Sequence, residues 1–88
     1  MKNWIDDARK QRELFGEKKY GHRIDPKNDP RCFRMEMLEE LLDSLNYLEW
    51  SFLKGEISSY KRRAIEADLR RVVNSIAMPC MNRLRGGP

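Results

Sequence analysis

The chain has little of the residues that many hydrolases use for nucleophilic catalysis. It contains one histidine and two cysteines in 88 residues. His22 supplies at most one member of a histidine-based triad, and Cys32 and Cys80 lack the close spacing of a zinc site. The glycines do not have the spacing of a glycine-rich phosphate loop. We therefore find little support for a triad hydrolase, a zinc protein or a P-loop enzyme.

Long apolar runs are also missing. No segment approaches the roughly 18 consecutive apolar residues that are needed to span a bilayer. The residues after Lys2 do not form the apolar stretch of a secretory signal. We therefore expect a cytoplasmic protein with reduced thiols and no membrane association.

The chain is short and highly charged. Charged residues make up 36% of it and hydrophobic residues 40%. A chain of this length buries only about 60–65% of its unfolded surface when it folds, so we expect a thin core. Oligomerisation is one way in which small proteins gain the missing core. The composition therefore predicts a homo-oligomer, either a dimer or a tetramer.

The formal net charge is +4, and the sign of the charge alternates along the chain. Positions 2–24 and those after 60 are mainly basic, whereas positions 34–50 are mainly acidic. Such alternation is typical of helices with solvated, mutually attractive faces. We do not expect nucleic-acid binding, because no aromatic-rich surface or reading motif accompanies the later basic residues. These residues are Lys61, Arg62, Arg63, Arg70 and Arg71.

Hydrophobic periodicity predicts a short N-terminal helix that begins at Trp4 and ends near Gly16. Residues 18–30 are rich in turn formers and are expected to form a basic loop. Asp29 and Pro30 have the residue types of an N-cap and a first helical position. A second helix is therefore expected to start there.

The second helix is expected to run to about Lys54, with Gly55 as its stop. Ser58 or Ser59 is expected to cap a third helix, which Pro79 ends. These elements predict an all-α fold, a long antiparallel helical hairpin with the N-terminal helix and loop laid against it. We expect this fold to assemble into an oligomeric helical bundle.

The predicted organisation is a single all-α domain over residues 1–88. Residues 1–30 form its N-terminal helix and basic loop, and residues 31–78 form the helical hairpin. Residues 79–88 are expected to form a flexible tail.

Four acidic residues gather in the first half of the second helix. At 100° per residue, Glu36, Glu40 and Asp43 lie within about 60° of one another. Their repulsion costs a few tenths of a kcal/mol per close pair, and a divalent cation would reverse that penalty. Because Mg²⁺ binds carboxylates together with water and phosphate oxygens, we predict Mg²⁺, or alternatively Mn²⁺, as the cofactor of these three residues. Glu39 is the predicted general base or ligand of a second ion, and Glu39 and Glu40 are the predicted catalytic residues.

Residues 39–48, EELLDSLNYL, resemble the E-x-x-D helix of the MazG-like all-α nucleoside triphosphate pyrophosphohydrolases. The Lys18-Lys19-Tyr20-Gly21 segment is similar to small phage-type members of that family. The resemblance implies helical subunits that form bundles, carboxylates that bind Mg²⁺, and cleavage of a nucleoside triphosphate to monophosphate and pyrophosphate. In it Glu40 and Asp43 match the E-x-x-D pair, and Glu36 and Glu39 match the partner E-x-x-E loosely.

The family carries its two acidic motifs on different helices, whereas this chain has all four acids on one helix. The alternative prediction is therefore a non-catalytic helical interaction protein of MazG-like fold with a degenerate acidic site, whose acidic face binds a basic partner.

A triphosphate substrate needs cationic contacts and contacts to its sugar and base. The predicted phosphate contacts are Lys18, Lys19 and Arg23 on the basic loop and Lys61 on the third helix. Asn46 and Tyr47 are the predicted contacts to sugar or base, with Trp50 as an alternative to Tyr47. Ordinary surface charge and interface packing are the competing interpretations of these residues.

Overall fold

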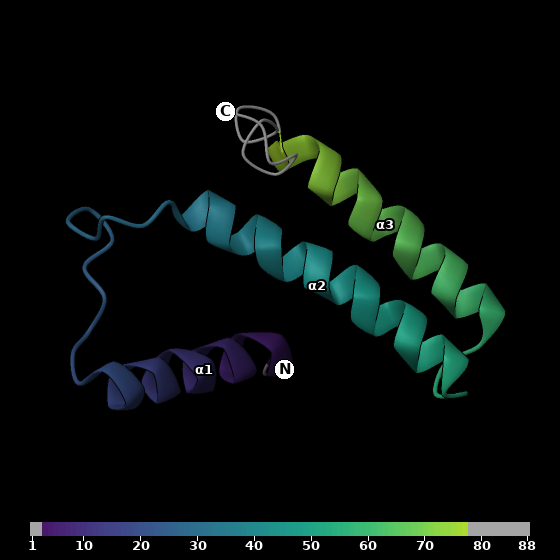
Figure 1. Cartoon of the computed structure of the whole chain (residues 1–88). Helices are drawn as coiled ribbons and strands as arrows, with labels where there is room; N and C mark the ends of the chain where they lie inside the picture. The colour runs from purple at the N-terminus through teal and green to yellow at the C-terminus, as the bar shows by residue number, and fades with distance from the viewer. Residues whose placement is uncertain (1–2, 78–88) are drawn as a thin grey trace. The chain divides into compact units, whose positions relative to one another are not determined.

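The computed structural model describes residues 3–77, which form three α-helices and no strand. Helix α1 spans Trp4–Tyr20, α2 spans Phe33–Leu53 and α3 spans Ser59–Ala77 (Figure 1). The all-α class is therefore confirmed. The predicted end of the third helix at Pro79 and the predicted tail 79–88 lie outside the described residues.

Helix α1 is longer than the sequence predicted. It begins where the Asn3 side chain accepts a hydrogen bond from the Ile5 backbone N–H at 2.9 Å. It continues through Gly16, because one glycine inside a helix costs only about 1 kcal/mol. The helix ends at Gly21, whose φ of 76° is a left-handed conformation that glycine adopts without a steric penalty. The predicted end near Gly16 was wrong.

Helix α2 begins later than the Asp29-Pro30 signal predicted. The backbone N–H of Asp29 instead donates to the Asp25 carbonyl at 3.0 Å. Asn28 closes the same turn, because its side chain donates to the Asp25 carboxylate at 2.6 Å. Turn formation therefore competes successfully with helix capping here, and Cys32 is the N-cap residue.

The segment between α2 and α3 is short. Gly55 has a φ of 87° there, and its backbone N–H donates to the Phe52 carbonyl at 3.0 Å. The Ser58 hydroxyl then accepts from the Lys61 backbone N–H at 3.1 Å. Ser58 is therefore the residue that caps α3.

The chain divides into two compact units, with the boundary between Pro30 and Arg31. The N-terminal unit contains α1 and the C-terminal unit contains α2 and α3. The prediction of one domain over the whole chain stays a prediction. None of the three described helices has an apolar stretch long enough to cross a bilayer.

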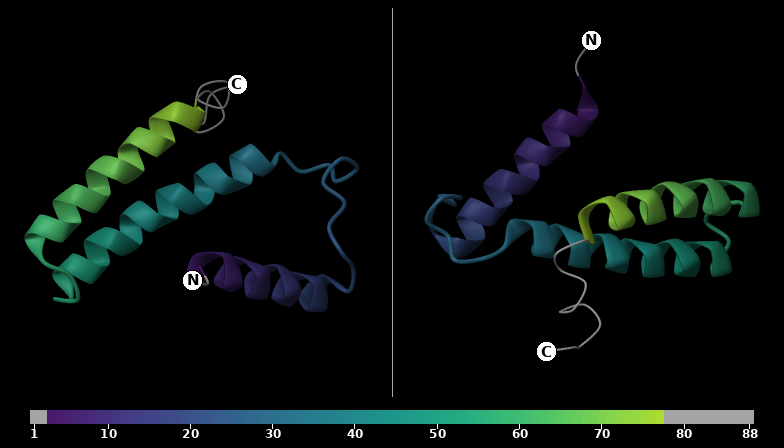
Figure 2. Two further views of the ribbon diagram at one scale, coloured as in Figure 1. Left: turned by 180° about the vertical axis from the view of Figure 1, so that it is seen from behind. Right: turned by 90° about the horizontal axis from the view of Figure 1, so that it is seen from above.

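The core of the C-terminal unit lies between α2 and α3, which run side by side in both views of Figure 2. Its buried side chains all come from α2 and are Met35, Leu38 and Leu48. Half-buried side chains on α3 face them, namely Leu69, Val73 and Ile76. The described part of the chain thus has a thin core, and many large apolar side chains stay exposed.

A polar cluster around Arg62 adds to this core. Its guanidinium donates to the Glu49 carboxylate at 3.0 Å and lies 4.5 Å from the centre of the Phe52 ring. The Glu66 carboxylate lies 3.9 Å from the same guanidinium nitrogen that contacts Glu49. The Arg62 side chain is only 25% exposed, so the cluster ties α3 to the second half of α2.

Leu38 is fully buried, whereas Leu53 on the same helix is 71% exposed. We expect Leu38→Ala to lower the free energy of unfolding by about 2–4 kcal/mol through the cavity that it leaves. Leu53→Ala is the matched control and should change it by less than about 0.5 kcal/mol. Urea unfolding followed by circular dichroism measures both values, and equal effects of the two substitutions would contradict this core.

Candidate functional site

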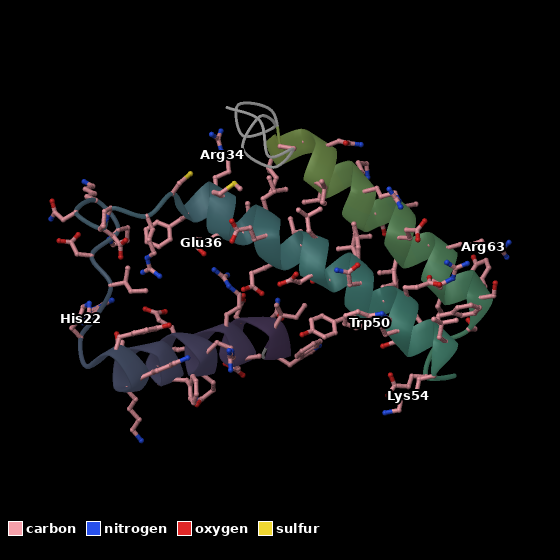
Figure 3. The ribbon with its side chains drawn as sticks, viewed as in Figure 1. His22, Arg34, Glu36, Trp50, Lys54 and Arg63 are labelled. Atoms are coloured by element: carbon pink, nitrogen blue, oxygen red, sulfur yellow. The ribbon has the colours of Figure 1, made fainter. Side chains whose placement is uncertain are left out.

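The acidic residues of α2 lie on its outer face, the side turned away from α3. Packing of Leu38 and Leu48 against α3 turns Glu36, Glu40 and Asp43 outward, because they are on the opposite side of the helix. All three are exposed. Figure 3 shows Glu36 on this side of α2. We call these three residues the acidic face.

The carboxylates of the first half of α2 have no ion-pair partner among residues 3–77. These unpaired residues are Glu36, Glu39, Glu40 and Asp43. Every later acid of the C-terminal unit is paired, namely Glu49, Glu56, Glu66 and Asp68. The negative charge of the acidic face is therefore uncompensated in this part of the chain.

The carboxylates of the acidic face follow one another along the helix and do not surround a single position. No three histidine, cysteine, aspartate or glutamate side chains within residues 3–77 lie close enough together to hold a metal ion. Residues one turn apart have β-carbons about 5–6 Å apart. Carboxylates in this arrangement offer one or two ligands at a time to a hydrated ion, which is a common way of binding Mg²⁺.

Two aromatic side chains continue the outer face of α2 beyond the acids. Tyr47 and Trp50 are 64% and 59% exposed. Their ring centres are 5.5 Å apart and their planes are nearly perpendicular, an edge-to-face contact. Asn46 beside them is also exposed. These residues form an open aromatic surface next to the carboxylates.

The predicted phosphate contacts lie on both units. Lys18 and Lys19 belong to the last turn of α1, so their placement in a loop was wrong. Arg23 follows α1, and its Nε is 3.8 Å from the Glu17 carboxylate. Lys61 lies in the first turn of α3 with an exposed side chain.

A hollow of about 880 Å³ lies in the N-terminal unit, between the second half of α1 and the residues that follow it. Lys18 and Arg23 line it, whereas Lys19 is not among its lining residues. The sequence analysis did not place other lining side chains at a site. They are the cationic Arg12, the apolar Leu14 and Phe15, and His22.

A signal for this hollow was present in the sequence. Arg12, Phe15 and Lys18 recur every third residue, so each of them neighbours the next on the surface of a helix. The predicted helix end near Gly16 separated Lys18 from the other two and hid this pattern.

No family model, curated protein or solved structure matches this chain. The MazG-like resemblance therefore stays a prediction carried by residues 39–48 and 18–21.

The unpaired charges of the acidic face make a prediction about stability. Glu40→Gln/Asp43→Asn should raise the free energy of unfolding by about 0.5–1 kcal/mol in metal-free, low-salt buffer, because several like-charge pairs one turn apart disappear. Glu36 is kept because its charge is favourable near the helix N-terminus. The gain should shrink at high ionic strength, where screening weakens the repulsion.

Glu49→Gln is the control for this measurement. It removes a carboxylate from the same helix but breaks the 3.0 Å contact with Arg62, so it should lower the free energy of unfolding. A loss of stability in both variants, measured by urea unfolding in EDTA, would contradict the view that the acidic face is uncompensated.

Proposed function

We propose that the protein is a Mg²⁺-dependent nucleotide pyrophosphohydrolase that cleaves a nucleoside triphosphate to monophosphate and pyrophosphate. One observation carries the proposal, namely the set of exposed carboxylates on α2 that lack an ion-pair partner within residues 3–77. The resemblance of residues 39–48 to the E-x-x-D helix supports the choice of reaction.

The donor set of the acidic face fits Mg²⁺, with Mn²⁺ as an alternative. It consists of oxygen atoms only, and hard divalent cations prefer oxygen ligands. One or two carboxylates at a time, from among Glu36, Glu40 and Asp43, would hold the hydrated ion. When bound, the ion supplies charge stabilisation to phosphate oxygens and acidifies a bound water.

The residues of the chain have separate roles in this proposal. Glu39 lies beside the acidic face and acts as the general base that takes a proton from the attacking water. The water oxygen forms a bond to the α-phosphorus, and the bond from that phosphorus to the bridging oxygen breaks, so that pyrophosphate leaves. Glu40 acts in both metal binding and catalysis.

Cationic side chains recognise the triphosphate in this proposal. These are Lys18, Lys19, Arg23 and Lys61, whose side chains are exposed and carry N–H donors for phosphate oxygens. Asn46 and Tyr47 contact the sugar or the base, since both are exposed on α2 next to Asp43.

The assembly is also part of the proposal. We infer that α2 and α3 act as an antiparallel hairpin that associates into a dimeric or tetrameric bundle in the cytoplasm. The thin core supports this, because exposed apolar side chains such as Leu42, Ile65 and Val72 gain burial on association.

A second candidate is a non-catalytic helical interaction protein. The observation that favours it is the exposed Tyr47–Trp50 pair beside unpaired carboxylates, because aromatic side chains are enriched at protein interfaces. In this case the acidic face binds a basic partner rather than a metal ion.

The test is release of pyrophosphate from a panel of ribo- and deoxyribonucleoside triphosphates with Mg²⁺. Wild type should form monophosphate and pyrophosphate in equal amounts. Glu40→Gln/Asp43→Asn should lose at least about 10- to 100-fold in rate, the cost typical of changing groups that merely support metal ligands.

Glu56→Gln/Asp68→Asn is the matched control, since it removes two exposed carboxylates of the same unit outside the acidic face. It should keep wild-type activity. Absence of turnover with every nucleotide would contradict the proposed pyrophosphohydrolase activity. Binding of a basic peptide that requires Glu40 and Asp43 would then support the second candidate, the helical interaction protein.

A further inference from the structure

Helix α1 carries exposed aromatic side chains along its length. Trp4, Phe15 and Tyr20 are 75%, 56% and 58% exposed. None of the residues of α1 is buried, so packing in the described chain does not account for these rings. Aromatic side chains are enriched where proteins contact a partner. Helix α1 therefore presents a candidate contact surface.

The aromatic residues of α1 share one side of the helix with cations. At 100° per residue, they fall with three basic residues into an arc about 160° wide. All acids of α1 lie outside this arc. We call this side the basic-aromatic face, and it consists of Trp4, Arg9, Arg12, Phe15, Lys19 and Tyr20. The predicted helix end near Gly16 left Lys19 and Tyr20 outside the helix and hid this pattern.

The positive charge of the basic-aromatic face is largely uncompensated. Arg12 and Lys19 have no ion-pair partner among residues 3–77. Arg9 lies 3.8 Å from the Asp6 carboxylate, and both side chains are highly exposed. Such pairs contribute little stability, and the guanidinium has further N–H donors. Arg9 can therefore still bind another anion, so the face favours an anionic partner.

Rings and cations are presented together on this face. The Arg12 guanidinium is 5.2 Å from the centre of the Phe15 ring, and the Lys19 ammonium is 5.5 Å from that of Tyr20. Along the helix, aromatic residues alternate with cations. A single-stranded nucleic acid has matching parts, because its phosphates bind cations and its unpaired bases stack on aromatic rings.

A lipid surface matches this pattern less well. Helices that lie on a membrane have an apolar side that is separate from their charged side. On α1 the two kinds of residue are mixed, since Arg12 and Lys19 lie between Phe15 and Ile5 around the helix. An acidic protein would engage the cations but has no regular series of flat rings for the aromatic residues.

We propose that the basic-aromatic face of α1 binds single-stranded nucleic acid, with phosphates on Arg9, Arg12 and Lys19 and bases stacked on the aromatic rings. From Trp4 to Tyr20 the helix rises by about 24 Å. At about 3.4 Å per phosphate of a stacked strand, this length covers about seven nucleotides. The proposal goes beyond the proposed function and requires no residue of the C-terminal unit.

This surface differs from the one for which nucleic-acid binding was not expected. That expectation concerned the basic residues after position 60, and the structure pairs several of them with acids. Arg62, Arg70 and Arg71 are ion-paired with Glu49, Glu66 and Asp68. The basic-aromatic face lies on a different unit and includes the aromatic residues that the later segment lacks.

The test is fluorescence anisotropy of a labelled ten-nucleotide single-stranded RNA, titrated with the full chain in EDTA. Phe15→Leu keeps an apolar helix former and should weaken binding at least about fivefold through loss of the stacked base. Phe15→Trp should bind like wild type. Arg9→Gln/Arg12→Gln should weaken binding and reduce the slope of log affinity against log salt by about 1.4, because each lost phosphate contact contributes about 0.7.

Matched controls come from the C-terminal unit. Lys54→Gln/Arg63→Gln removes the same charge from exposed positions outside α1 (Figure 3). Tyr60→Leu removes a ring that is 76% exposed on α3. Affinity should stay within about twofold of wild type in both controls, because distant charges are screened. Circular dichroism checks that every variant keeps its helices.

Wild-type affinity in Phe15→Leu and in Arg9→Gln/Arg12→Gln would overturn the proposal. Equal affinity for duplex RNA, or equal displacement by polyglutamate, would overturn the role of the aromatic rings. Binding to phosphatidylserine vesicles without binding to RNA would overturn the choice of partner. A DNA strand of the same sequence should bind within a few-fold of the RNA, because stacking and phosphate contacts do not require the 2′-hydroxyl group.

The outcome is separable from that of the proposed function. Glu40→Gln/Asp43→Asn should bind the RNA at least as tightly as wild type in EDTA, and loss of binding there would contradict the assignment to α1. Arg9→Gln/Arg12→Gln should release pyrophosphate at the wild-type rate, since neither arginine has a role in that reaction.

Discussion

Helix α2 has two chemically different sides, and its contact with α3 determines which side faces outward. Burial of Leu38 and Leu48 leaves the helix one rotation about its own axis that removes apolar side chains from water. That rotation directs Glu36, Glu40 and Asp43 outward. Arg62 reinforces it from α3 through its 3.0 Å contact with Glu49. The candidate site is therefore a direct consequence of how the core is packed.

The same packing divides the charges of the C-terminal unit. Acids of the second half of α2 and of α3 lie near arginines or lysines, as Glu49 and Glu66 do around Arg62. The acids of the first half of α2 have no ion-pair partner in the described chain, so their charges stay available to an external cation. Exposed ion pairs contribute little stability by themselves. Their absence at the acidic face is informative because it leaves an electrostatic cost that a ligand can relieve.

The sequence predicted features that depend on local order. The three helices follow from the hydrophobic period, Ser58 caps α3 and is one of the two predicted caps, and the 100° rotation per residue placed the acids on one face. Two predictions of helix ends that relied on a single residue type were wrong. The first helix continues through Gly16, and the backbone N–H of Asp29 forms a turn with Asp25 where the second helix was expected to start. The hollow was not predicted, because the predicted helix end near Gly16 separated Lys18 from Arg12 and Phe15, and because its other wall depends on the direction that the chain takes after Gly21.

The proposed function depends on binding of a divalent cation by the outer face of α2. The most direct measurement is nuclear magnetic resonance of the ¹⁵N-labelled protein during titration with Mn²⁺, whose unpaired electrons broaden the signals of nearby amides. We predict early and selective broadening of the amide signals of residues 36–43, smaller effects on α3, and loss of this selectivity in Glu40→Gln/Asp43→Asn. Uniform broadening over the chain, or broadening centred on the paired acids Glu66 and Asp68, would contradict the account.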